Sequence, residues 1–169
     1  MQSTIKNEFR EHLKVSKVSM ESIIGPIEKA AKICINSLKN GNKILIFGNG
    51  GSAADSQHIA AEIVGRYKVE RRGLAAIALT TDSSVLTAIG NDYGYLHLFD
   101  RQVEALANKG DVLIGISTGG TSKNVVSAIK LAKKIGCKAI GFSGKNGCLL
   151  YTSDAADDLL CVDLGGRRI

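Results

Sequence analysis

One stretch decides the fold of this chain: Phe47-Gly48-Asn49-Gly50-Gly51-Ser52-Ala53-Ala54-Asp55-Ser56-Gln57-His58-Ile59-Ala60-Ala61-Glu62. The apolar run just before it, residues 43–47, is typical of a buried strand. The three glycines let the backbone turn sharply and come close to a ligand, because no Cβ stands in the way. Ser52 followed by Asp55 predicts a helix start capped by the serine. Strand, glycine turn and helix N-terminus together predict an anion-binding site.

His58 and Glu62 are four residues apart on the predicted helix, which should run to about residue 66. Their side chains therefore leave the same helix face, where an imidazole and a carboxylate could bind a metal or move a proton. The alternative is an ordinary surface helix that happens to contain these residues. A second predicted anion loop argues against that alternative.

The second loop is Ser117-Thr118-Gly119-Gly120-Thr121-Ser122, between a predicted strand at 111–116 and a predicted helix at 123–135. Its hydroxyls and glycine amides again lead into a helix N-terminus. Further strands are predicted at 74–79 and 138–142, further helices at 82–89 and 96–107, and a turn at 91–94. Alternating strands and helices predict a parallel sheet covered on both faces. Because ligands bind at the carboxyl ends of such strands, both loops should face one pocket.

Residues 3–38 have the apolar spacing of a helix, interrupted at Gly25-Pro26, so we expect two helices or one helix with a joint. Packing against another subunit is the favoured role of this segment, and packing on its own domain is the alternative. A basic cluster follows residue 65. Within it, Lys68, Arg71 and Arg72 are expected to lie in a solvated loop.

The composition is that of one ordinary domain of 169 residues with a net charge of +6. This charge fits an anionic small molecule as well as nucleic acid and decides between them in neither direction. No nucleic-acid partner is expected. Four scattered cysteines without a C-x-x-C pair indicate reduced thiols. The N-terminus lacks a signal-peptide core and no run reaches membrane-spanning length, so a cytoplasmic protein is predicted.

Residues 48–53 also fit the dinucleotide fingerprint G-x-G-x-x-A. That interpretation requires an acidic residue about 20 positions on, at the end of the second strand. The first acid after that strand is Asp82, some 30 residues past the loop, and the second anion loop would remain unexplained. Neither loop is followed by a Walker lysine, which disfavours phosphoryl transfer.

Five segments carry a resemblance to a known family: GNGGSAADxQHxAAE (48–62), GRY (65–67), ALTTD (78–82), IGNDYG (89–94) and GISTxGxS (115–122). They resemble the sugar isomerase (SIS) fold and, more closely, the phosphoheptose isomerase family of bacterial heptose and lipopolysaccharide-core synthesis. The resemblance covers about residues 1–147. It implies an α/β, three-layer αβα sandwich with a central parallel sheet and an N-terminal helical extension. It also implies a division into a helical oligomerisation segment (1–40), a sugar-phosphate-binding domain (41–147) that is incomplete at its C-terminus, and a non-family tail (148–169).

The resemblance also implies roles for particular residues. Asn49, Gly50, Gly51 and Ser52 would contact the sugar chain, Asn91 and Asp92 its hydroxyls, and Ser117, Thr118, Gly119 and Ser122 the phosphate. Arg66 would add positive charge from a neighbouring subunit of a homotetramer with active sites at the subunit interfaces. His58 and Glu62 would bind one zinc ion per subunit, with Glu62 also the proton-transferring base. Gly119 stands where the family usually has serine.

The resemblance implies isomerisation of sedoheptulose 7-phosphate to D-glycero-D-manno-heptose 7-phosphate, and these residues suit aldose–ketose chemistry. A proton is taken from a carbon beside a carbonyl and returned to its neighbour through an enediol. That reaction needs a general base and an electrophile such as Zn²⁺. Phosphate binding at a distance positions the reacting carbons.

The family pattern stops near residue 148. The tail contains neither the glutamine nor the histidine that the family's C-terminal helix contributes. We interpret it as the conceptual translation of a sequencing-library adapter joined to a truncated read. A genuine C-terminus whose residues 159–164 form a fifth strand is the alternative. Because a catalytic zinc site needs about three protein ligands, the chain as written is expected to be inactive. The competing function is that of a non-catalytic SIS protein, which senses sugar phosphates or associates with the replication initiator.

Overall fold

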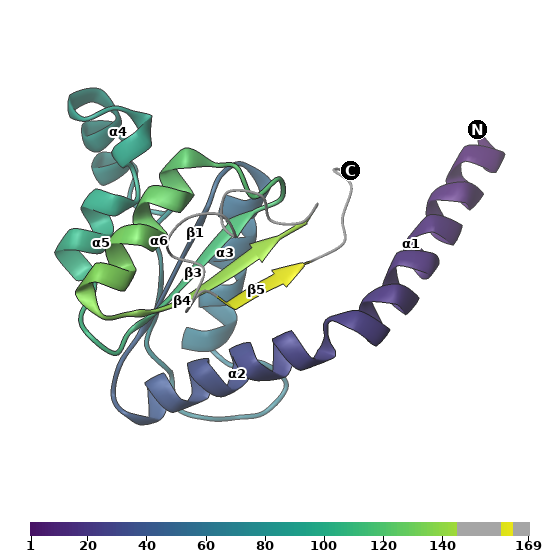
Figure 1. Cartoon of the computed structure of the whole chain (residues 1–169), viewed down its shortest axis with the longest axis horizontal. Helices are drawn as coiled ribbons and strands as arrows, with labels where there is room; N and C mark the ends of the chain where they lie inside the picture. The colour runs from purple at the N-terminus through teal and green to yellow at the C-terminus, as the bar shows by residue number, and fades with distance from the viewer. Residues whose placement is uncertain (145–159, 164–169) are drawn as a thin grey trace.

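The computed structural model describes residues 1–144 and the backbone of residues 160–163. A parallel sheet of five strands in the order β2-β1-β3-β4-β5 forms its centre (Figure 1). The strands are β1 Ile44–Gly48, β2 Ala76–Ala78, β3 Val112–Ser117, β4 Lys138–Ser143 and β5 Leu160–Asp163. Every neighbouring pair is parallel. The predicted α/β class and parallel sheet are therefore confirmed.

Helices cover both faces of the sheet, as Figure 1 shows. They are α1 Gln2–Ser22, α2 Ile24–Lys39, α3 Gly51–Val64, α4 Ser83–Asp92, α5 Asp100–Leu106 and α6 Lys123–Ile135, with a 3₁₀ turn η1 at Tyr95–His97. Alternate residues of β1 point to opposite faces. Leu45 and Phe47 pack with α5 and α6, while Ile44 and Ile46 pack with α2 and α3. This double burial explains why β1 is a continuous apolar run.

The two N-terminal helices differ in whether they pack on their own domain. Residues of α2 such as Ala30 and Leu38 pack on the sheet of their own domain. Helix α1 buries none of its residues and extends away from the domain (Figure 1). The break between them falls at Ile23, before Gly25-Pro26. Pro26 would clash with the carbonyl four residues earlier, that of Ser22, so the first helix has to end there.

A few predicted boundaries were wrong in detail. Asn91 and Asp92 form the last turn of α4 and not a separate turn, and the Tyr93 N–H donates to Ile89 O at 2.9 Å where this helix ends. At its start, Asp82 caps the helix by accepting a hydrogen bond from Val85 N–H at 2.9 Å. The helix predicted at 96–107 is a 3₁₀ turn followed by the short α5.

Arg71 lies in a loop, as expected, and is partly exposed, but its side chain also has a structural role. Its guanidinium donates to the backbone carbonyls of Glu62 (2.8 Å) and Gly65 (3.3 Å), where α3 ends. The last carbonyls of a helix lack intrahelical partners, and a nearby arginine satisfies them. Lys68 and Arg72 are exposed, as expected.

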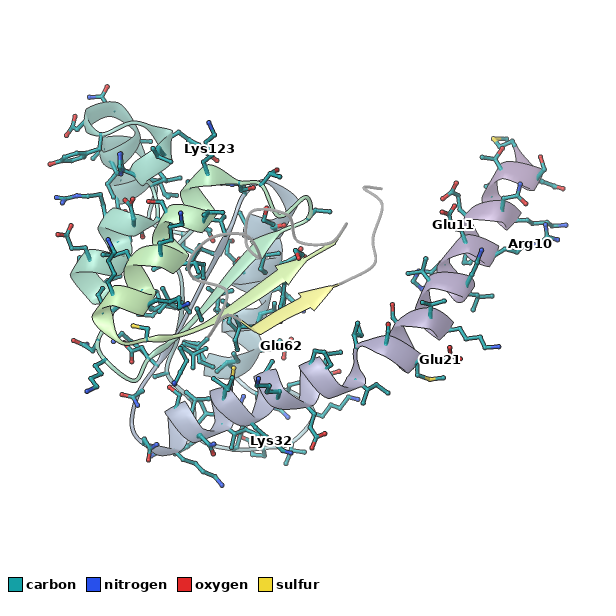
Figure 2. All side chains as sticks on the ribbon, in the orientation of Figure 1. Arg10, Glu11, Glu21, Lys32, Glu62 and Lys123 are labelled. Atoms are coloured by element: carbon teal, nitrogen blue, oxygen red, sulfur yellow. The ribbon has the colours of Figure 1, made fainter. Side chains whose placement is uncertain are left out.

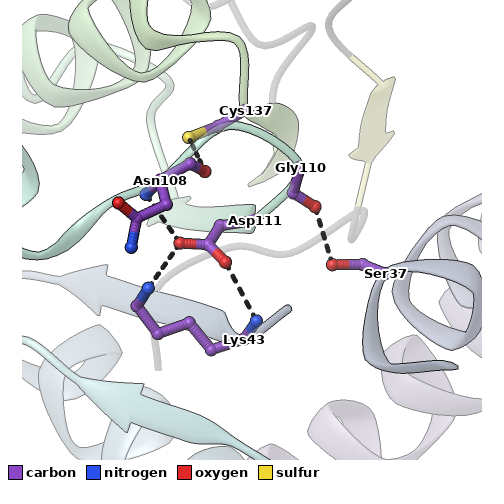
Figure 3. Close-up of polar contacts among 6 residues, drawn as sticks. All are labelled: Ser37, Lys43, Asn108, Gly110, Asp111 and Cys137. Carbon is purple, nitrogen blue, oxygen red and sulfur yellow. Dashed lines mark hydrogen bonds and ion pairs between the residues drawn. The ribbon is translucent and has the colours of Figure 1, made fainter. Parts of the chain in front are cut away.

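A buried carboxylate organises the amino ends of the strands (Figure 3). Asp111 is 1% exposed and accepts hydrogen bonds from Lys43 N (3.0 Å), Lys43 Nζ (2.6 Å) and Asn108 N (2.8 Å). Burial alone would raise the pKa of this carboxyl, but the hydrogen bonds and charge of Lys43 with the Asn108 amide outweigh it and the pKa lies below its ordinary value. Nearby, Ser37 Oγ donates to Gly110 O at 2.9 Å, which fastens α2 to the same edge.

Residues 145–159 and 164–169, which include most of the predicted tail (148–169), lie outside the described residues. The strand that the alternative placed at 159–164 is present as Leu160–Asp163, paired with β4. No helix in the described part of the chain is long and apolar enough to cross a membrane.

Candidate active site

The first loop follows β1 and depends on glycine at two positions. A Cβ at Gly48 would lie 2.7 Å from Ser52 Cβ and 2.8 Å from Ile116 O, so this position admits no side chain without a backbone shift. Gly50 has φ +58°, in the left-handed region that favours glycine. The predicted cap by Ser52 was wrong: Gly50 is the N-cap residue and Ser52 lies in the first turn of α3. With this backbone the helix begins before the serine can cap it.

The second loop follows β3. Ser117 Oγ donates to Ser122 Oγ at 2.9 Å, and Gly120 N–H donates to Ser117 O at 2.8 Å. Gly120 has φ +65°, which closes the turn. Ser122 is the N-cap residue of α6, while Thr118 and Gly119 are exposed. The loop thus presents hydroxyls and amides beside the positive end of a helix.

The two loops lie side by side because their strands are neighbours. Gly48 is paired with Ile116 at the carboxyl ends of β1 and β3. A reciprocal pair of hydrogen bonds joins the loops: Asn49 Nδ2 donates to Asn124 Oδ1 (2.9 Å) and Asn124 Nδ2 donates to Asn49 Oδ1 (3.0 Å). Tyr95 Oη also donates to Asn49 Oδ1 at 2.8 Å. The segment after α4 is thereby tied to the first loop.

Asn91 and Asp92 stand just before that segment, at the end of α4. Both are exposed, and Asn91 Nδ2 donates to Asp92 Oδ1 at 2.8 Å. Their polar groups are therefore accessible to a ligand. The expected sugar and phosphate contacts thus lie on two neighbouring loops and on a third segment that is bonded to one of them.

His58 and Glu62 are on one face of α3, with His58 Nε2 3.8 Å from Glu62 Oε1. Their side chains are 78% and 38% exposed. At about 1.5 Å per residue, Glu62 lies roughly 16 Å along the helix from Gly51. Figure 2 shows Glu62 well separated from Lys123, which begins α6 beside the second loop. Glu62 is therefore not brought together with the phosphate loop of its own chain.

Arg66 lies past the end of α3, further still from the loops. It forms an ion pair with Glu70 at 3.2 Å, and both side chains are largely exposed. An exposed pair of this kind contributes little to stability, so Arg66 can exchange partners at small cost.

Zinc fits the chemistry of His58 and Glu62, since imidazole nitrogen and carboxylate oxygen are both zinc ligands. The described residues, however, contain no group of three or more histidine, cysteine, aspartate or glutamate side chains that could hold a metal. Two donors on one helix do not complete a catalytic zinc site. No step of the chemistry below is therefore assigned to a metal.

Sequence reasoning missed Asn124 and Tyr95. Asn124 is 4% exposed, and a buried amide in the first turn after a glycine loop needs hydrogen-bond partners. Its place two residues after Ser122 was a usable signal. No sequence signal pointed to Tyr95, because only the tertiary structure brings it to Asn49.

Comparison with known proteins places these features in a family. Residues 9–144 match the model of the SIS domain. The chain is 63% identical to the phosphoheptose isomerase of Aliarcobacter butzleri over 87% of this chain and 78% of that protein. It is 58% identical to that of Helicobacter hepaticus, over 87% of this chain and 74% of that protein.

Two solved structures that resemble this chain are also phosphoheptose isomerases. The phosphoheptose isomerase of Neisseria gonorrhoeae matches with a TM-score of 0.88 and 43% identity, over 99% of this chain and 87% of that one. That of Francisella tularensis matches with a TM-score of 0.89 and 34% identity over the same shares.

Proposed function

The chain belongs to the phosphoheptose isomerase family of SIS-domain proteins, and on that premise we propose that it binds sedoheptulose 7-phosphate for isomerisation to D-glycero-D-manno-heptose 7-phosphate. The observation that carries this proposal is the pair of glycine loops at neighbouring strand ends, joined through Asn49 and Asn124. One loop suits a phosphate and the other a polyhydroxylated chain. Few ligands other than a sugar phosphate need both.

The phosphate binds at Ser117, Thr118, Gly119 and Ser122. The start of α6 supplies unpaired N–H groups and a positive dipole end, and hydroxyls at 117, 118 and 122 add donors. Lys123, exposed at the first position of α6, adds a positive charge to this loop. Asn49, Gly50, Gly51 and Ser52 contact the sugar chain, and Asn91 and Asp92 its hydroxyls.

Glu62 acts as the general base of the reaction. It removes a proton from C1 of the ketose while O2 takes up a proton, giving the enediol. The O1 hydroxyl then loses its proton as C2 gains one, giving the aldose. A carboxylate is suited to both transfers, because it can hold the carbon-derived proton between them. His58, on the same helix face, is positioned to assist with oxygen-bound protons.

The site is shared between subunits of a homotetramer. Glu62, near the end of α3, and Arg66, past its end, lie too far from the loops of their own chain, so they serve the loops of a neighbour. Helix α1 supports assembly, because Ile5, Phe9 and Leu13 are 52–68% exposed on a helix with no buried residue. Exposed apolar side chains repeated at helical spacing are typical of a helix–helix interface.

His58 and Glu62 would supply two ligands of a zinc site, and a family-type C-terminal helix would complete it; in the chain as written the site stays incomplete. Zinc would supply the electrophile that stabilises an enediol oxygen. The check is the zinc content of a chimera that carries a family-type C-terminal helix, measured by metal mass spectrometry; His58→Ala in that chimera should lose the zinc and the thermal stabilisation that zinc gives.

A cytoplasmic location is part of the proposal. Cys34 and Cys137 are free, and burial raises the pKa of each thiol to about 11, with the charge of Asp111 adding to the shift at Cys137. Both thiols are therefore protonated and unreactive at neutral pH, as packed cysteines of a reducing compartment are.

Binding is tested by thermal unfolding with and without sedoheptulose 7-phosphate. The ligand should raise the unfolding temperature of the chain, and Ser117→Ala with Ser122→Ala should abolish the rise. A matched control is Ser83→Ala with Ser84→Ala, at exposed positions in α4. A double phosphate-loop variant that responds like the parent would disprove the phosphate assignment.

Turnover is a separate test. The inactivity of the chain as written stays a prediction. The assay follows sedoheptulose 7-phosphate with added Zn²⁺, beside a chimera that carries a family-type C-terminal helix. Robust turnover by the parent chain would contradict that prediction while supporting the proposed reaction.

A further inference from the structure

We propose that Asn124 is a positioning residue, which fixes the side chain of Asn49 so that the first loop offers an N–H donor to an oxygen of the sugar chain. This inference rests on the proposed function for the identity of the ligand. It goes beyond it by assigning a role to a residue that contacts no substrate. It also specifies which hydrogen-bonding group the site presents.

The orientation of both amides follows from one backbone donor. Val125 N–H can only donate, and it lies 3.0 Å from Asn124 Oδ1. The oxygen of Asn124 is therefore identified by its partner, although an amide's oxygen and nitrogen are otherwise hard to tell apart. That oxygen also accepts from Asn49 Nδ2, so the nitrogen of Asn124 must donate in return to Asn49 Oδ1.

The same reasoning identifies the hydrogen-bonding group of Asn49 that remains unused. Its oxygen accepts from Asn124 Nδ2 and from Tyr95 Oη, which fills both lone pairs. Its nitrogen carries two hydrogens and uses one of them, toward Asn124. Within residues 1–144 the other N–H has no partner. The free capacity of Asn49 is thus a donor, which recognises a hydroxyl or carbonyl oxygen and not an N–H group.

Asn124 also couples the two loops. It lies in the first turn of α6, close after Ser122, and is almost fully buried. Asn49 is only partly buried and sits on the glycine turn after β1. The buried amide therefore holds the more exposed one. A shift of the start of α6 on phosphate binding would be passed directly to the sugar-binding loop.

The test measures dissociation constants of the full chain for sedoheptulose 7-phosphate and for inorganic phosphate. Asn124→Ala should weaken sugar-phosphate binding about tenfold, the effect of one to two hydrogen bonds. Inorganic phosphate, which does not reach Asn49, should be affected less than about twofold. Asn36→Ala, at an exposed position of α2, is the matched control and should change neither constant.

Two further variants separate positioning from a merely structural role. If Asn124 acts through Asn49, then Asn49→Ala and the double variant Asn49→Ala/Asn124→Ala should bind the sugar phosphate equally well. Tyr95→Phe removes one of two donors to Asn49 and should weaken binding about threefold. An equal loss for both ligands in Asn124→Ala, or an additional loss in the double variant, would overturn the proposal.

A ligand-free readout keeps this inference distinct from the proposed function. Side-chain amide hydrogens of Asn49 can be followed by NMR, and the one bonded to Asn124 should exchange slowly in the parent chain. Asn124→Ala should abolish that protection, and unchanged protection would overturn the positioning role. If the parent chain fails to bind the sugar phosphate while the protection behaves as expected, the proposed function fails and the positioning role stands.

Discussion

Strands β1 and β3 carry polar clusters at both of their ends, and the two clusters differ in how completely their hydrogen bonds are satisfied. At the amino ends, both oxygens of the buried Asp111 have donors, from Lys43 and Asn108. At the carboxyl ends, Asn49 keeps an N–H without a partner among the described residues, and Thr118 and Gly119 are exposed. The same pair of strands thus supports two kinds of polar site.

Spare hydrogen-bonding capacity distinguishes the residues that bind a ligand from those that stabilise the fold. A buried polar group with all its partners stabilises one conformation and has nothing left for a ligand. A group with spare capacity at the carboxyl edge is available for binding. Substitutions at the amino end should therefore change stability without changing affinity, and substitutions at the carboxyl end should do the reverse.

The largest effect is expected for Asp111→Ala. Removing the carboxylate leaves the Lys43 ammonium and the backbone N–H groups of Lys43 and Asn108 without their acceptor, which should lower the free energy of unfolding by about 3 kcal/mol in urea titrations. The affinity of the folded protein for inorganic phosphate should not change. Glu104→Ala is the control, because it breaks the exposed Arg101–Glu104 pair and should cost less than about 0.5 kcal/mol. Equal losses in the free energy of unfolding for Asp111→Ala and Glu104→Ala would contradict the stabilising role of Asp111.

Gly48→Ala should change stability and affinity together, since it alters both packing and the binding loop. The new Cβ would meet Ser52 Cβ and Ile116 O, so the backbone of the first loop has to move. We expect a loss of about 2 kcal/mol in stability and loss of stabilisation by sugar phosphate. Gly25→Ala, with nothing within 4 Å of its Cβ, should instead stabilise α2 slightly. A Gly48→Ala protein that binds normally would show that the turn tolerates displacement.

The third expectation concerns pH. The folded-state pKa of Asp111 lies below its ordinary value of 3.8. Its contribution to stability is therefore fully present above that value and is lost as the pH falls through the folded-state pKa. The stability advantage of the parent over Asp111→Asn should be constant from pH 7 to about 5 and shrink below about 4. Urea midpoints across this range test it, and an advantage that persists unchanged at pH 2 would contradict it.

The smallest effect is expected for Gly119→Ser, which restores the hydroxyl usual in the family. A Cβ here has Thr121 Oγ1 as its nearest neighbour, at 3.4 Å, so a side chain fits. Inorganic phosphate should bind a few-fold more tightly with unchanged stability, as measured by calorimetry. Gly120→Ser is the contrast, because φ +65° strains any side chain there and stability should fall. No gain in affinity for Gly119→Ser would mean that the phosphate lies away from position 119.

Much of this was predictable from local sequence patterns. The helix at 123–135 was predicted with its observed bounds, and β1 and β3 within one residue at each end. Apolar runs and glycine-to-helix transitions are local signals, and here no tertiary contact overrode them. The cap of α3 was mispredicted because Ser52 matched a capping pattern that the left-handed Gly50 pre-empted. The cap by Arg71 went unpredicted because its partners are backbone carbonyls six to nine residues earlier.

Local sequence patterns were enough to predict the α/β class, the two glycine loops and the His58–Glu62 pair on one helix face, because each depends on residues close together in the chain. Only the tertiary structure decided which groups share a site. It brought Tyr95 and Asn124 to Asn49, and it left Glu62 near the far end of α3 and Arg66 beyond that end, away from both loops. The physical reason is that hydrogen bonds and helix length act through space. Tyr95 and Asn124, 46 and 75 positions from Asn49, supply its hydrogen-bond partners, while Glu62, only 13 residues on, is placed far from it by the helix between them.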